Sequence, residues 1–294
     1  MASATDDALA VIAPAVLRGE CILFLGAGVH YPPPVCSPFR YPESEQPPLG
    51  SALSEALAAK CGFVDRFPTE SPTNLQRVAL CYERRFNRPQ LIKELEAAVD
   101  VGKEPSPALR MLAELDFPLV VTTNYDQLFE RALAAEGKQP DLQVYSCDER
   151  VETNEPPLQL DPRRPYFLKL HGDIRMPESI VITDEDYIHF VMRMTDKEPQ
   201  NPVASGVRYF FKKMTTLFIG YSLLDYNLRL LFRTLRWKVD RSKVPDTFSI
   251  DPFPDPLILD IWFNERRQVT FVAQSVWDFL PRLLERVADL KAAP

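Results

Sequence analysis

The chain has 294 residues, of which 46% are hydrophobic and 26% are charged. This composition is typical of a globular protein, and a chain of this length buries a large core when it folds. The 10 glycines are about half, and the 28 prolines about twice, the number that average usage would give. These proportions exclude a collagen-like chain and a flexible Gly/Ser linker.

Charge and cysteine content exclude further classes of protein. The net charge is -7 and the basic residues form no stripe, so direct binding to nucleic acid is not expected. The N-terminal segment is acidic where a signal peptide is basic, and no apolar run reaches about 18 residues. We therefore expect a cytoplasmic protein without a membrane-spanning helix. The five cysteines include no CxxC pair, which argues against a zinc site.

The first part of the chain is predicted to be mostly helical. Apolar spacing predicts a helix over 6–18, and a buried strand over Cys21–Leu25 leads into a glycine turn. The following segment, 31–50, is too rich in proline for regular structure. Four further helices are then predicted, over 51–61, 74–86, 89–100 and 106–115.

The rest of the chain alternates apolar strands with helical patterns. The predicted elements are strands at 119–121, 165–173, 179–183, 217–219 and 269–273, and helices at 126–137, after Asp184, after Ser222 and at 275–290. The segments 148–165 and 240–256 are predicted to be loops.

This alternation predicts an α/β protein with a Rossmann-like parallel sheet and helices on both faces. We expect a single domain over 1–294, with a mainly helical sub-region at about 50–115. Four strands end in small or polar residues, with the sequences GAG, TTNYD, HGD and GYS. Because ligands bind at the carboxyl ends of strands in such sheets, these four turns are expected to meet in one crevice.

The glycine turn Gly26-Ala27-Gly28 has two interpretations. It follows a strand, so its backbone could approach a pyrophosphate closely, or it could be an ordinary tight turn. Tyr31 stands where the dinucleotide fingerprint GxGxxG has its third glycine. A standard NAD dehydrogenase is therefore disfavoured.

The remaining polar turns are also ambiguous when taken singly. Asn124 and Asp126 could contact ribose hydroxyls or a carboxamide, or one of them could cap the next helix. His171 could accept a proton near neutral pH or could be structural. His30 is expected to be a loop residue and His189 a packing residue.

The fourth turn is Gly220-Tyr221-Ser222. Ser222 could contact a phosphate or could cap the helix that follows. On that helix, Asp225 and Arg229 are four residues apart, and an ion pair within the helix is the simpler interpretation.

Taken together, the segments FLGAGV, SPFR, TTNYD, KLHGD and FIGYSLLDYNLR resemble the sirtuin family over about 20–235. Their order and spacing are most similar to the sirtuin-like branch found in bacterial antiphage defence. The resemblance implies an NAD site whose pyrophosphate lies at the glycine turn, with Arg40 as an NAD contact. It places a second phosphate-contacting turn at Gly220 and Ser222. The residues that it implies for cofactor binding are Gly26, Ala27, Gly28, Arg40, Gly220 and Ser222.

The resemblance also implies the roles of the other turns. Asn124 and His171 match the family's catalytic residues, and Asp126 matches the residue that recognises nicotinamide. Phe39 matches an aromatic ring on the nicotinamide side, whereas Pro38 stands where the family has Asp. Protein-deacylating sirtuins carry a zinc module with two CxxC pairs. Because this chain has none, we expect a helical insertion in its place, no zinc and no deacylation.

The function implied is hydrolysis of NAD+ to nicotinamide and ADP-ribose by an NAD-depleting effector of antiphage defence. Such an enzyme must be restrained, which implies a homo-oligomer or a separately encoded activator, such as an ATPase or an Argonaute-like sensor. The alternative is a non-catalytic module that binds NAD or ADP-ribose and controls a partner. The stiff, proline-rich segment 31–48 is the expected gate of the site.

Overall fold

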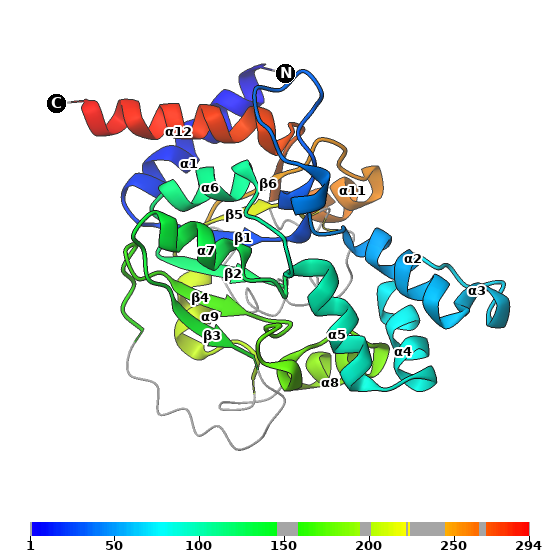
Figure 1. Ribbon diagram of the computed structural model, residues 1–294. Helices are drawn as coiled ribbons and strands as arrows, with labels where there is room; N and C mark the ends of the chain where they lie inside the picture. Colours follow the sequence, from blue (N-terminus) through cyan, green and yellow to red (C-terminus); the bar gives the residue numbers. More distant parts are fainter. Residues whose placement is uncertain are drawn as a thin grey trace.

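The computed structural model describes residues 2–145, 158–194, 201–221, 223, 245–264 and 269–293. In these ranges seven strands form one parallel sheet, which confirms the predicted fold class (Figure 1). Across the sheet the strands are β3 (Asp141–Val144), β4 (Tyr166–Lys169), β2 (Leu119–Thr122), β1 (Cys21–Leu25), β5 (Thr215–Ile219), β6 (Thr247–Ile250) and β7 (Val269–Val272).

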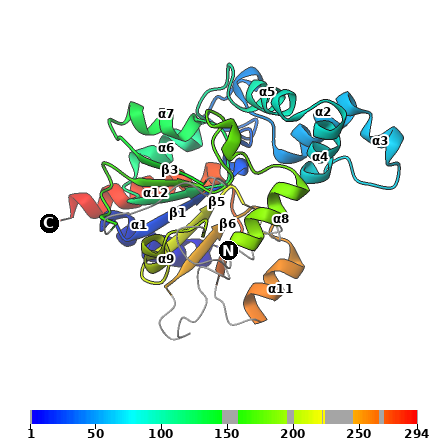
Figure 2. The same cartoon turned by 90° about the horizontal axis from the view of Figure 1, so that it is seen from below.

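Helices cover both faces of the sheet (Figure 2). One face carries α1 (Ala2–Leu17), α6 (Pro107–Glu114), α7 (Leu128–Ala135) and α12 (Val276–Ala292), and the other carries α8 (Asp184–Arg193), α9 (Ser205–Phe211) and α11 (Pro256–Asn264). The central strand β1 is buried throughout, with Leu23 and Leu25 in the first core and Ile22 and Phe24 in the second. A strand that faces two cores must be apolar along its whole length, which is why it could be predicted.

A third core lies within the helical sub-region, beside α8 in Figure 1. It is built by α2 (Gly50–Cys61), α3 (Phe63–Arg66), α4 (Leu75–Arg85) and α5 (Arg88–Val99). Asn74 and Asn87 accept hydrogen bonds from backbone amides in the first turns of α4 and α5, which fixes where these helices begin. The helix α6 packs on the sheet instead of on this sub-region. Within the described ranges, no helix is both long and apolar enough to cross a membrane.

Two predictions about strands are wrong. The segment 179–183 forms no strand, because Val181 enters the second core while Ile180 and Ile182 enter the third, and this gives strand-like alternation without a neighbouring strand. The predicted loop 240–256 contains β6. This strand alternates Thr247 and Ser249 with apolar residues, so its sequence has no continuous apolar run.

Candidate active site

The described residues of the four polar turns lie at one edge of the sheet. They follow β4, β2, β1 and β5, which are neighbours in that order. Leu25 is in register with Thr122 on one side and with Ile219 on the other, and Thr122 is in register with Lys169. The turns therefore start at the same level, and their side chains share one edge.

The glycine turn is fixed by backbone packing against the turn after β5. The Gly26 amide donates to the Ile219 carbonyl at 2.9 Å, and the Gly28 amide donates to the Gly220 carbonyl at 3.0 Å. A Cβ atom on Gly26 would lie 2.5 Å from the Gly220 oxygen, and one on Gly28 would lie 2.8 Å from it. These glycines are thus required for packing, and two of the amides expected to face a pyrophosphate already have partners within the protein.

Replacing Gly220 by alanine is expected to lower the free energy of unfolding by about 2 kcal/mol. Gly220 has a φ of +77°, and a Cβ atom would lie 2.5 Å from the Val29 nitrogen and 2.6 Å from the Gly26 oxygen. Gly102 is a matched control, because its φ is +68° and a Cβ atom there would meet nothing within 4 Å. Gly102→Ala is expected to cost only about 1 kcal/mol, from backbone strain alone. Urea unfolding of both variants measures the difference, and equal losses would contradict the packing argument.

Asn124 and Asp126 lie on the loop after β2. The Thr122 hydroxyl donates to the Leu25 carbonyl at 2.7 Å and accepts from the backbone N–H of Asn124 at 3.0 Å, so the loop is tied to β1. Asp126 Oδ1 accepts a hydrogen bond from the Leu128 amide at 2.9 Å, so Asp126 holds the start of α7. A cavity of about 10 Å³, room for a single water molecule, is bordered by both residues.

Asp126 is ionised in its buried position. Burial alone would raise its pKa, but contact with His30 and the nearby Lys169 ammonium hold the pKa below its ordinary value. His30 Nε2 lies 3.6 Å from Asp126 Oδ2. His30 is therefore part of the site and not an ordinary loop residue, since it ends a short 3₁₀ turn over Ala27–His30 and is only 4% exposed. His189, expected to pack in the core, is exposed on α8.

His171 follows β4 and is enclosed by aromatic rings. Its Nδ1 lies 3.2 Å from the Tyr187 hydroxyl, and the rings of Tyr187 and Phe190 pack edge-on against the imidazole at 5.0 and 5.3 Å. Burial lowers the pKa of His171 to about 3. The imidazole is therefore neutral at physiological pH, and the Tyr187 hydroxyl holds its orientation.

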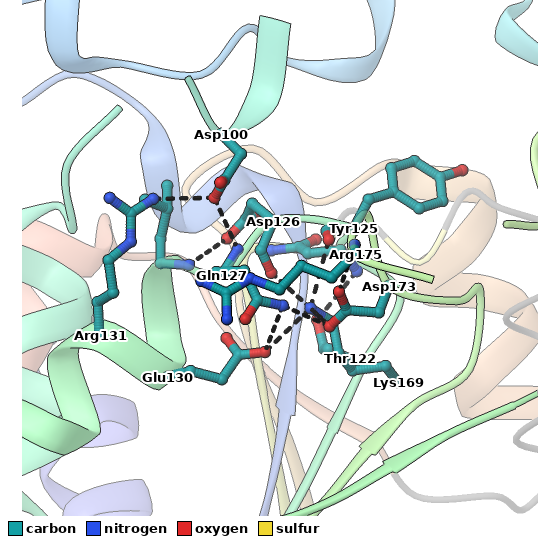
Figure 3. Close-up of polar contacts among 12 residues, drawn as sticks. Asp100, Thr122, Tyr125, Asp126, Gln127, Glu130, Arg131, Lys169, Asp173 and Arg175 are labelled. Carbon is teal, nitrogen blue, oxygen red and sulfur yellow. Dashed lines mark hydrogen bonds and ion pairs between the residues drawn. The ribbon is translucent and has the colours of Figure 1, made fainter. Parts of the chain in front are cut away.

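A buried charge cluster lies beneath these turns (Figure 3). The Lys169 side chain is fully buried, and its Nζ lies 2.8 Å from Asp173 Oδ2 and 3.0 Å from Glu130 Oε1. It also donates to the carbonyls of Tyr125 and Asp126, at 3.3 and 2.5 Å. Lys169 thus holds the backbone of the loop that carries both Asn124 and Asp126. Sequence reasoning missed this residue, although a lysine that ends an otherwise apolar strand was a usable signal.

Burial and charge shift the pKa values of Glu130 and Lys169 in this cluster. Burial raises the pKa of Glu130 to about 7, although Lys169 opposes the shift. Burial alone would lower the pKa of Lys169, but Glu130, Asp173 and Asp126 raise it above its ordinary value. Gln127 Nε2 also donates to Asp173 Oδ2, so the cluster joins the turns after β2 and β4.

The second half of the expected gate, 31–48, is tied to a neighbouring segment of the chain. The Tyr41 hydroxyl donates to the Glu104 carbonyl at 2.9 Å, and the Glu104 amide donates to the Glu45 carbonyl at 3.1 Å, so the second half of the segment is tied to 103–104. The Phe39 ring packs against Trp277 with centroids 5.4 Å apart, and Arg40 is exposed. Ser222, Asp225 and Arg229 lie outside the described residues.

Comparison with known families identifies the family of this chain. The SIR2-like domain family matches residues 118–271, which is more than half of the chain. This chain belongs to the SIR2-like family. The matched part of this SIR2-like chain runs from just before β2 into β7, so it includes the turns that carry Asn124, Asp126 and His171. The glycine turn precedes it.

Individual relatives of this SIR2-like chain are similar at modest identity. It is 29% identical over 168 residues to "NAD(+) hydrolase ThsA" of Acinetobacter baumannii and 31% identical over 193 residues to the protein of that name from Cytobacillus dafuensis. It is also 29% identical over 161 residues to "Defense-associated sirtuin 2" of Bacillus subtilis. These alignments cover 57%, 61% and 53% of this chain, but only 32%, 36% and 14% of the relatives. The chain thus spans about a third of the length of the hydrolases that it matches.

Among the described residues of this SIR2-like chain, no group of three His, Cys, Asp or Glu side chains is placed to hold a metal ion. Cys21, Cys36, Cys61 and Cys81 are free thiols, and Cys147 lies outside the described residues.

Proposed function

We propose that this chain hydrolyses NAD+ at the bond between nicotinamide and ribose, releasing nicotinamide, ADP-ribose and a proton. The observation that carries this proposal is the placement of Asn124, Asp126 and His171 on adjacent strand ends of a SIR2-like fold. The names of the two NAD(+) hydrolases to which this chain is similar support the same chemistry.

The reaction needs orientation more than acid catalysis. Nicotinamide leaves as a neutral group while positive charge develops on the ribose, as in other glycosidic cleavages. The site must hold the substrate, hydrogen-bond the ribose hydroxyls and position a water molecule. Asn124, which has both a donor and an acceptor, would orient the ribose or the water.

His171 and Asp126 would take complementary roles. With a pKa of about 3, His171 is neutral at physiological pH, so its imidazole would accept a hydrogen bond and orient a ribose hydroxyl or the attacking water. It would not keep a proton taken from either group at neutral pH. Asp126 is an ionised, buried carboxylate, and it would accept a hydrogen bond from the carboxamide NH₂ of nicotinamide. We place the phosphates of NAD+ near Ala27 and Gly220, with Arg40 as a further contact.

The test is NAD+ cleavage by the full chain, measured as released nicotinamide. Asn124→Ala and His171→Ala are each expected to reduce turnover at least 100-fold, which is the lower end of the usual contribution of such groups. His189→Ala is the matched control, because His189 is exposed on α8 and should leave turnover unchanged. Wild-type turnover in either active-site variant would overturn the assignment. Binding of NAD+ without cleavage by the wild type would favour a non-catalytic nucleotide-binding module.

We further propose that the enzyme depletes NAD+ in antiphage defence and is held inactive until it is triggered. A homo-oligomer or a separately encoded activator, such as an ATPase or an Argonaute-like sensor, would supply the trigger. A rate of cleavage per protein molecule that rises with protein concentration would favour self-assembly. Cleavage that requires a second protein at every concentration would favour the activator.

A further inference from the structure

His30 is a buried imidazole whose ring nitrogens have no hydrogen-bond partner in the described part of the chain. Its side chain is 3% exposed, and neither Nδ1 nor Nε2 has a hydrogen-bond partner there. Buried polar atoms are nearly always hydrogen-bonded, because an unpaired one costs about 1–3 kcal/mol. An imidazole kept in this position therefore requires an explanation.

The nearest charged group is the Asp126 carboxylate. His30 Nε2 lies 3.6 Å from Asp126 Oδ2, which is too long for a hydrogen bond between them. The other carboxylate oxygen, Oδ1, is occupied by the Leu128 amide. The two side chains thus lie side by side, and each has hydrogen-bonding capacity available toward a third group.

A primary carboxamide fits such a pair. It presents an NH₂ donor and a carbonyl acceptor, which lie about 2.2 Å apart given standard bond lengths. An ionised carboxylate can only accept, so Asp126 can bind the NH₂ group but not the carbonyl oxygen. An imidazole that carries a proton on Nε2 supplies the missing donor.

We propose that His30 donates a hydrogen bond from Nε2 to the carboxamide oxygen of nicotinamide, while Asp126 accepts one from its NH₂ group. This inference rests on the proposed function and assigns a specificity residue within it. The pair selects a primary carboxamide, because an analogue that lacks either group leaves His30 or Asp126 unpaired. A 3-carboxylate would face the negative charge of Asp126 and is rejected.

The experiment compares three dinucleotides with the full chain: NAD+, its 3-acetylpyridine analogue, which keeps the carbonyl but has no NH₂, and the analogue with an unsubstituted pyridine. For His30→Leu, KM is expected to rise about tenfold for NAD+ and for the acetyl analogue, relative to wild type with the same substrate. It should not change for unsubstituted pyridine. His30→Gln, whose side-chain amide can donate from a similar position, is expected to restore most of the loss. Asp126→Asn should affect NAD+ more than the acetyl analogue.

A second readout does not depend on turnover. Calorimetric binding of free nicotinamide, 3-acetylpyridine and pyridine, with ADP-ribose present, should show the same selectivity in the wild type and its loss in His30→Leu. Selective binding without cleavage would overturn the proposed function but support the role of His30. Normal wild-type cleavage with an equal effect of His30→Leu on all three substrates, or with no effect, would overturn the role of His30 alone. Failure of the wild type both to cleave NAD+ and to bind any of the three rings would overturn both.

Discussion

Replacing Lys169 by methionine is expected to lower the free energy of unfolding by about 3–5 kcal/mol. The Lys169 ammonium is fully buried and neutralises Glu130 and Asp173, which lie 3.0 and 2.8 Å from it. Methionine fills a similar volume but carries no charge. The variant would therefore keep two buried carboxylates without their counter-ion, and the cost of an unpaired buried charge exceeds that of lost packing.

The substitution is also expected to reduce NAD+ cleavage by more than the loss of stability explains. Lys169 Nζ donates to the carbonyls of Tyr125 and Asp126, and these lie on the loop that positions Asn124. Without the ammonium the loop would be free to shift, and a shift of about 1 Å in a positioned group can cost about 100-fold in rate. Activity should therefore fall even at temperatures where the variant remains folded.

Urea unfolding at pH 7.5 and nicotinamide release measure the two effects. Lys60→Met is the matched control, because Lys60 pairs with Glu94 at the surface and its side chain is 53% exposed. Exposed pairs contribute about 0–1 kcal/mol, so this variant should resemble the wild type. A combined Lys169→Met, Glu130→Gln, Asp173→Asn variant should recover part of the stability. Equal losses of unfolding free energy for Lys169→Met and Lys60→Met would show that the buried cluster stabilises the protein no more than an exposed ion pair does.

The sheet edge that carries the candidate site could be predicted from the sequence, because it depends on local patterns. β1, β2, β4 and β5 are each an apolar run followed by small or polar residues, and parallel strands bring such ends to one edge. β6 was missed for the converse reason, since its Thr247 and Ser249 interrupt the apolar run. A buried strand can therefore be located from the sequence only where its buried residues are apolar.

The contacts beneath the site could not be predicted, because they join residues that are distant in sequence. The distance of 3.6 Å between His30 and Asp126 depends on how the turn after β1 packs beside the turn after β2. The glycine pattern is a similar case, since Gly26 and Gly28 were assigned to a ligand but also pack against the Gly220 backbone. Sequence spacing shows that a small residue is needed, but not which group approaches it.

The stability of the protein is expected to depend on pH through His171. The pKa of this imidazole is about 3 in the folded protein and about 6.5 in the unfolded chain. Between these values the unfolded chain binds a proton that the native state does not. The contribution of His171 to the free energy of unfolding should therefore fall by about 1.4 kcal/mol for each pH unit as the pH decreases from 6.5 to about 3.

Glu130 is expected to act in the opposite direction over much of the same range. Its pKa is about 7 in the folded protein, against an ordinary value of about 4.5, so the native state binds the extra proton and stability falls as the pH rises toward 7. Between about pH 4.5 and 6.5 the two contributions nearly cancel. Wild-type stability should change little from these two groups there, although each is worth about 3 kcal/mol over that interval.

Separating the two groups by mutation should reveal both slopes. In Glu130→Gln the His171 contribution is unopposed, and we expect stability relative to the wild type to fall by about 3 kcal/mol from pH 6.5 to 4.5. In His171→Gln the Glu130 contribution remains, and relative stability should fall by a similar amount from pH 4.5 to 6.5. His189→Gln, at an exposed position on α8, should parallel the wild type. Urea unfolding of the four proteins at half-unit pH intervals measures these slopes. Parallel curves of stability against pH for all four would contradict the shifted pKa values of both His171 and Glu130.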